Sequence, residues 1–238
     1  MKAAALVIAA VGALALPASA RAADMPGSWP PAYEKPVSPF TELSSGWYLR
    51  GDLGYRYNRL SSIDSVVPVT AQHYDNAISY GGGFGYKHKW FRADLTLDYT
   101  GPARITGTTT PPTAQPQYST KVETVVGLVN GYLDLGTWSG FTPYVGAGAG
   151  AAYISTYDYR NTTLPVGELV PTASKTNFAW AWMAGVSFQV TPNWAFDIGY
   201  RNLHLGDAIS GTESTGAITR FRGLSAQEIR VGFRLILD

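Results

Sequence analysis

The sequence lacks cysteine, has few charged residues, and has a long apolar run only at its N-terminus. Without cysteine the chain forms neither disulfides nor thiolate metal sites. Charged residues make up 15% of the 238 residues and the formal net charge is +1, so no basic excess indicates a nucleic-acid partner. Beyond the N-terminus no apolar run reaches the roughly 20 residues that a membrane-spanning helix needs. If the chain enters a membrane, it must cross it with strands.

The N-terminal segment has the three parts of a secretory signal peptide. Lys2 supplies the positive charge, residues 3–16 are apolar, and small residues follow. Cleavage after Ala20 and cleavage after Ala22 both fit the small-x-small rule. The run is too short to be a spanning anchor, so residues 1–22 are predicted to be a cleaved signal peptide. Its removal takes away Lys2 and Arg21 and leaves sixteen basic and seventeen acidic residues.

Residues 23–44 contain five prolines and no apolar periodicity. Proline-rich segments are extended and have no core of their own. We therefore expect residues 23–44 to form an extended periplasmic tether. Residues 45–238 are expected to form one domain.

The C-terminal segment, residues 228–238, alternates between two unlike faces. A strand points successive side chains to opposite sides. One face here is apolar and the other carries charge: Ile229, Val231, Phe233, Leu235 and Leu237 against Glu228, Arg230, Gly232 and Arg234. In a membrane barrel the apolar face meets lipid and the polar face points into the lumen.

Seven further segments alternate in a similar way, and each is close to the 9–11 residues that a tilted strand needs to cross a bilayer. They are residues 46–57, 77–87, 90–99, 120–135, 143–156, 177–190 and 194–205. Residues 120–135 alternate weakly, with Asn130, Tyr132 and Asp134 expected inside. Connections are short around 88–89, 136–141 and 191–193, but long at 58–75, 100–119, 157–175 and 206–223, as in outer-membrane barrels. The predicted fold is all-β, an eight-stranded antiparallel up-and-down transmembrane β-barrel.

The predicted inward faces carry charges of both signs. An eight-stranded barrel is only wide enough for its side chains to fill it, and an unpaired buried charge is costly. We therefore expect a paired network that closes the lumen, with a narrow path for ions or very small solutes as the alternative. Its expected members are Arg50, Asp52, Arg56, Lys87, Arg92, Asp94, Asp98, Asp197, Arg201, Glu228, Arg230 and Arg234.

The predicted outward faces carry aromatic rings near both strand ends, as in the girdles that mark membrane interfaces. The periplasmic girdle is expected to contain Trp47, Phe91, Phe188 and Trp194, and the outer girdle Tyr55, Tyr57, Tyr80, Tyr99, Phe178 and Trp180. A secreted soluble barrel of the lipocalin type would also alternate. It does not explain aromatic bands on the apolar face or long loops on one side only.

Four stretches also resemble a known family: residues 130–136 (Asn-Gly-Tyr-Leu-Asp-Leu-Gly), 142–150, 200–207 and 230–234. They are similar to the small outer-membrane β-barrels that include OmpA-like, OmpX-like and opacity-type surface proteins, and above all to the opacity-like antigens and "porin family" proteins of alphaproteobacteria. The resemblance runs from about residue 45 to the end.

The resemblance implies a place in the Gram-negative outer membrane, in contact with its lipid and with lipopolysaccharide. It also implies loops that make surface contacts with unidentified partners, and a C-terminal strand that the barrel assembly machinery reads. Members of the family usually end on Phe or Trp. This chain departs from that pattern, because Leu237 and Asp238 stand at its end.

The sequence offers little for catalysis or for a cofactor. His73, His88 and His204 have no partners at ligand spacing, so no metal site is expected. Some eight-stranded barrels deacylate lipid A with a His-x-Ser pair, but Gly206 follows His204 at the serine position and Ser210 is more distant. We therefore expect a non-enzymatic barrel with a structural and surface-contact role. A narrow pore is the second reading and a lipid A-modifying enzyme the third.

Overall fold

The computed structural model describes residues 45–65, 69–109, 118–161, 170–213, 216 and 218–237. The predicted signal peptide, its cleavage sites and the predicted tether lie outside these residues. Among the residues that are described, no helix has the length and apolar character needed to cross a membrane.

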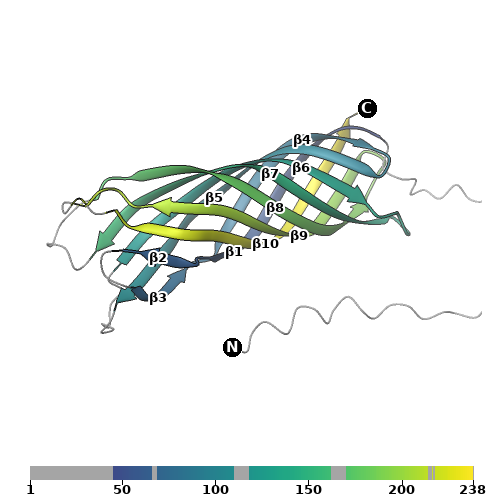
Figure 1. The fold of residues 1–238 in the computed structure, drawn as a ribbon. Coiled ribbons are helices and arrows are strands. Elements are labelled where there is room, and N and C mark those ends of the chain that lie inside the picture. Colours follow the sequence, from purple (N-terminus) through teal and green to yellow (C-terminus); the bar gives the residue numbers. More distant parts are fainter. Residues whose placement is uncertain are drawn as a thin grey trace, which may run out of the picture. The chain divides into compact units, whose positions relative to one another are not determined.

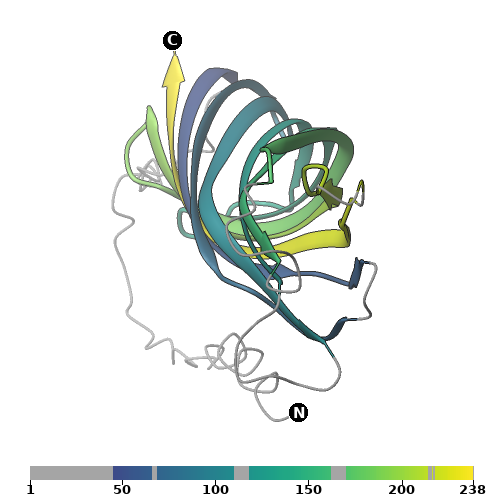
Figure 2. The same ribbon diagram turned by 90° about the vertical axis from the view of Figure 1, so that its left-hand side faces the viewer.

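Eight long antiparallel strands form a closed barrel (Figure 1). They are β1 (Gly46–Arg59), β4 (Ala77–His88), β5 (Phe91–Thr109), β6 (Tyr118–Asp134), β7 (Phe141–Asn161), β8 (Ala173–Gln189), β9 (Trp194–Ile209) and β10 (Arg220–Leu237). Each pairs with the next, and β1 also pairs with β10 from Trp47↔Leu237 to Arg59↔Ser225. Figure 2 shows the resulting ring of strands. The predicted eight-stranded barrel is confirmed.

Two short strands lie in the connection from β1 to β4. β2 (Ser62–Asp64) pairs with β10, and β3 (Val69–Tyr74) pairs with β5. Where the β1–β4 ladder ends at Arg56↔Ala77, side-chain hydrogen bonds continue the contact. Asn58 Nδ2 donates to the Asp75 carbonyl at 2.8 Å, and Gln72 Nε2 donates to the Ser61 carbonyl at 2.9 Å. The long connection predicted at 58–75 therefore contains two short strands.

The other three long connections are also shorter than predicted, because the strands continue beyond the expected ends. β5 runs to Thr109 and β6 starts at Tyr118, while β9 and β10 extend to Ile209 and back to Arg220. The charged-against-apolar pattern that identifies the membrane-crossing part stops near Tyr99, but inward Ala103 and Ile105 keep burying apolar surface. Strand pairing persists there because these inward residues form a core of their own.

The opposite end of the barrel has the short turns that were predicted. Lys89 in the β4–β5 turn has φ 51°, and in the β6–β7 turn Ser139 has φ 51° and Gly140 has φ 84°. Tight reversals need such left-handed residues. The short turns therefore define the periplasmic end, and the strand extensions define the extracellular end.

Side-chain facing follows the predicted alternation. On β1, Trp47 and Leu53 are 58% and 59% exposed, whereas Arg56 is 1% exposed. On the weakly alternating β6, Asn130, Tyr132 and Asp134 face the interior as expected. Exposed large apolar residues form a belt around the outer wall, the arrangement that a lipid-facing surface requires.

We expect Leu97→Arg to lower the free energy of unfolding in lipid vesicles by roughly 2–4 kcal/mol, the midplane cost of a lipid-facing arginine. Leu97 is 63% exposed on the outer face of β5. Thr106→Arg is the control, since Thr106 lies on the same face of β5 beyond the apolar belt, and its cost should stay within about 0.5 kcal/mol. Denaturant titration measures both changes. Equal costs would place the lipid belt elsewhere.

Candidate functional site

The interior of the barrel holds all twelve charged residues of the predicted network. The most exposed of these side chains, that of Arg230, is 11% exposed. They come from β1, β4, β5, β9 and β10, and the interior side chains of β6, β7 and β8 complete the site. The charged side chains form three layers, from the extracellular side to the periplasmic side.

The extracellular layer of ion pairs crosses the barrel. Arg201 on β9 donates to Asp98 on β5 at 2.7 Å and to Glu228 on β10 at 2.6 Å. Arg56 also binds Glu228, and Arg230 donates to Asp98 at 2.8 Å. β5 and β9 stand on opposite walls in the order of strands. The bore is therefore narrow enough for direct contact across it.

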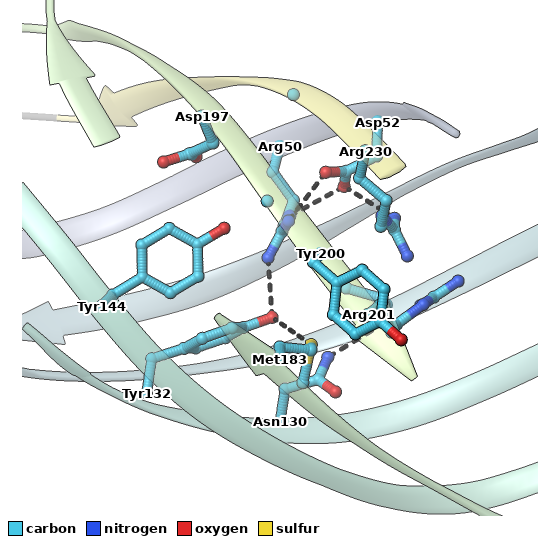
Figure 3. Close-up of a pocket in the computed structure, with 13 residues that line it drawn as sticks. Arg50, Asp52, Asn130, Tyr132, Tyr144, Met183, Asp197, Tyr200, Arg201 and Arg230 are labelled. Atoms are coloured by element: carbon cyan, nitrogen blue, oxygen red, sulfur yellow. Dashed lines mark hydrogen bonds and ion pairs between the residues drawn. The ribbon is translucent and has the colours of Figure 1, made fainter. Parts of the chain in front are cut away.

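The middle layer is centred on Arg50, whose guanidinium bridges two carboxylates. It donates to Asp52 and to Asp94, each at 2.7 Å, and to the Tyr132 hydroxyl at 2.9 Å. Asn130 donates to the other oxygen of Asp94 at 2.8 Å. Figure 3 shows Arg50, Asp52 and Tyr132 converging on the interior.

The periplasmic layer pairs acids with bases and stacks the bases on tyrosine rings. Asp134 binds Lys87 and accepts from Arg92 at 2.9 Å, and the Arg92 guanidinium lies 4.7 Å from the Tyr144 ring centroid. Arg234 donates to Asp197 at 2.6 Å. Stacking on an aromatic face stabilises a desolvated cation, so these arginines gain contacts beyond their ion pairs.

Several interior polar residues were not in the predicted network: Tyr48, Asn130, Tyr132, Asp134, Tyr144 and Ser187. With Asp134 the interior carries seven bases and six acids. Alternation alone would place each of them inward. The sequence placed Asn130, Tyr132 and Asp134 inside, but the predicted network took its charged members only from the strands with clear alternation.

A small cavity lies among the ion pairs and is lined by residues of all three layers. Its volume is about 20 Å³, and Arg50, Asn130, Tyr132, Met183 and Arg230 are among the residues that line it (Figure 3). A cavity that admits a water needs about 10–15 Å³ of such volume. The space therefore suits a single water molecule rather than an organic ligand.

An apolar layer lies on the extracellular side of the ion pairs, and the sequence analysis did not predict it. Its members are at most 2% exposed: Ile105, Val126, Leu128, Ile154, Ala179, Leu203, Leu205, Phe221 and Leu224. On β9, Leu203 and Leu205 follow Arg201 towards the extracellular end. On β5 the alternation resumes at Ala103 and Ile105 after an irregular step in the ladder, and this resumed alternation is the signal that could have revealed the layer.

Above the apolar layer, a polar cluster ties the extracellular ends of β7, β9 and β10 together. The hydroxyl of Tyr159 donates to Glu213 at 2.9 Å and lies 2.9 Å from the Thr219 hydroxyl. Burial raises the pKa of Tyr159 well above its usual value of 10. The phenol therefore stays protonated and remains a hydrogen-bond donor at neutral pH.

The predicted interface aromatics lie on the outer wall in two bands. Tyr80 contacts Tyr99 near the extracellular edge at 5.3 Å between ring centroids, and Phe188 contacts Phe141 near the periplasmic edge at 4.9 Å. Four further exposed rings lie at the periplasmic edge and were not predicted: Tyr86, Trp90, Trp138 and Phe141. The role of both bands as membrane girdles stays a prediction.

Among the described residues, the histidines contact neither a nucleophile nor a set of metal ligands. His204 stacks on Trp180 at the outer face of the barrel, with 4.0 Å between ring centroids. Ser210 is buried, donates to the Gly211 carbonyl at 2.8 Å and accepts from the Thr219 amide. In the part of the chain that the structure describes, no three His, Asp or Glu side chains are grouped as metal ligands.

A family model described as "Outer membrane protein beta-barrel domain" matches residues 5–235. An uncharacterized protein of Brucella suis biovar 1 is 30% identical over 245 residues, which cover 80% of this chain and 84% of that protein. Outer membrane protein PagN of Salmonella typhimurium is 39% identical over 82 residues, a third of either chain. The crystal structure of OprG from Pseudomonas aeruginosa superimposes with a TM-score of 0.51 at 13% identity, covering 82% of this chain and 97% of OprG. This last likeness concerns the fold.

Removal of Arg201, which binds both Asp98 and Glu228, tests whether the ion pairs are energetically coupled. We expect Arg201→Met to lower the free energy of unfolding by about 3–5 kcal/mol, because it leaves Asp98 and Glu228 each without one buried partner. The double variant Arg201→Met/Glu228→Gln should cost about 0.5–3 kcal/mol less than the sum of the single changes. Arg59→Met, at an exposed position of β1, is the control. Strict additivity in denaturant titrations would show that the pair is not coupled.

Proposed function

Because the chain belongs to the outer membrane β-barrel family, it is a protein of the Gram-negative outer membrane, and we propose that it acts there as a closed, non-enzymatic surface barrel. Its lumen holds the wall together and carries no solute. The strand ends and loops beyond the lipid make its contacts with other molecules. A cleaved signal peptide, residues 1–22, delivers the chain, and its C-terminal strand is the part that the assembly machinery reads.

One observation carries the proposal. Two kinds of barrier lie in series along the lumen: the ion pairs that join opposite walls, and the apolar layer around Leu128 and Leu203, both 0% exposed. The cavity of about 20 Å³ between the ion pairs is far smaller than a hydrated ion path. A desolvated ion in the apolar layer would also lack partners, which is costly.

The absence of an enzymatic role is supported by the placement of His204 and Ser210. The imidazole lies on the outer wall against Trp180, and the hydroxyl makes two backbone hydrogen bonds in the interior. A nucleophile must lie within hydrogen-bond reach of its base. These two groups lie on opposite sides of the wall, so they do not form such a pair.

Conductance in planar bilayers tests the closed lumen. We expect no stepwise ion conductance from the wild type, and none when a single barrier is weakened by Asp98→Ser/Arg230→Ser or by Leu128→Ser/Leu203→Ser. The combination of all four changes should conduct, because both barriers are then hydrated. A heat-dependent shift in gel mobility checks that each variant is folded.

Three outcomes would count against the proposal. Sugar-sized solutes that cross vesicles containing the wild type would favour the pore instead. Conductance in either two-residue variant would show that the two barriers do not act in series. Release of acyl chains from lipopolysaccharide by the purified protein would replace the proposal with the enzymatic reading.

A further inference from the structure

A basic groove lies on the outer wall of the barrel, away from the lumen. Its volume is about 250 Å³, and it is lined by Arg104, Ser119, Lys121, Asp158 and Arg160. These residues come from three adjacent strands, β5, β6 and β7. The register sets Arg104 opposite Lys121 and Ser119 opposite Arg160, so the three bases lie on neighbouring positions of one surface.

The groove lies just beyond the lipid-facing belt. The outward ring of Tyr99 precedes Arg104 on β5, and that of Tyr153 precedes Arg160 on β7. With a rise of about 3.3 Å per residue and a tilt of about 40°, the bases stand roughly 10–20 Å to the extracellular side of these rings. In the outer leaflet of this membrane, that level holds the phosphorylated sugars of lipopolysaccharide.

The charges of the groove suit a phosphate. Lys121 Nζ contacts Asp158 at 2.7 Å, and Arg104 and Arg160 are exposed. The hydrogen bond and charge of Lys121, with the charges of Arg160 and Arg104, hold the pKa of Asp158 below its usual value, so the carboxylate stays ionised. Three bases and one acid leave a net charge of about +2, against roughly −1.5 to −2 on a phosphomonoester at neutral pH.

Aromatic rings separate the groove from the lipid belt. The register sets Val125 between Tyr99 and Tyr153 on the belt side of the groove, and the Tyr157 hydroxyl donates to Glu123 at 2.8 Å. The groove therefore opens at the rim of the belt.

From the charge and the level of the groove, we propose that the outer wall of β5–β7 holds a specific site for one lipopolysaccharide molecule. A phosphate of its lipid A binds Arg104, Lys121 and Arg160. The position of the groove at the rim of the lipid belt favours the phosphate of a membrane lipid over free phosphate.

The first test compares two probes on the protein purified from membranes and placed in phosphatidylcholine nanodiscs. Wild type should bind bis-phosphorylated lipid A more tightly than the same lipid without phosphates. Arg104→Gln/Arg160→Gln should reduce this preference by about fivefold for each cation removed. The matched control is Arg220→Gln/Arg222→Gln, which removes two exposed arginines from β10 on the opposite wall and should leave the preference unchanged.

A further variant tests the charge of the groove. Asp158→Asn raises this charge by one and should strengthen the preference by about fivefold, a gain that misfolding does not produce. Asn suits this position because Asp158 has φ 51°, a value that Asn adopts more readily than most residues.

Three results would overturn the site. Wild type could bind both lipids equally, or the β10 control could lose as much preference as the groove variant. Displacement of lipid A by millimolar inorganic phosphate would show that the groove is a site for the free ion. These results concern the outer wall and the conductance tests concern the lumen, so failure of one proposal is distinguishable from failure of the other.

Discussion

A strand inside a bilayer has no water to satisfy its backbone, so each of its N–H and C=O groups needs a neighbouring strand. The pairing of β1 with β10 meets this need, because it closes the sheet and leaves no free edge within the lipid. Closure also sorts the side chains. Once the ring is complete, every second residue points into a bore that only eight strands enclose, and every other residue points to lipid.

The interior side chains fill this narrow bore in two ways. On the periplasmic side of the apolar layer, Arg50, Arg201 and Arg234 pair with carboxylates from other strands, and Arg201 does so across the bore. Charges so deeply buried are tolerated because their partners supply the hydrogen bonds that water would have supplied. Towards the extracellular end, apolar residues such as Leu203 take over. The proposed closed lumen depends on both the ion pairs and the apolar residues.

On the outer wall, the side chains match the layer of membrane that faces them. Large apolar residues such as Leu97 and Ile198 are exposed within the belt, and basic residues such as Arg104 and Arg160 appear just beyond it. The proposed lipopolysaccharide site lies where these two zones meet on β5–β7. It uses groups that neither the barrel closure nor the lumen requires.

Strong local patterns made much of this molecule predictable. The alternation on β1, β4, β5, β9 and β10 identified the strands, the facing of their side chains and the twelve interior charges. This was possible because successive residues of a strand point to opposite faces. Short periplasmic turns were predictable for a similar reason, since turn residues such as Gly140 are local signals. The strand extensions were missed because Ala103 and Ile105 follow the irregular Thr100–Ala103 step in the ladder, where alternation breaks.

The sequence by itself determined which residues alternate and therefore which share a face. The tertiary structure alone decided which of them meet. Asp98 and Arg201 are more than a hundred positions apart and touch only because closure and the width of the bore bring β5 opposite β9. Arg104, Lys121 and Arg160 likewise become one groove only through strand register, because a side chain's sequence position does not specify its neighbours on other strands.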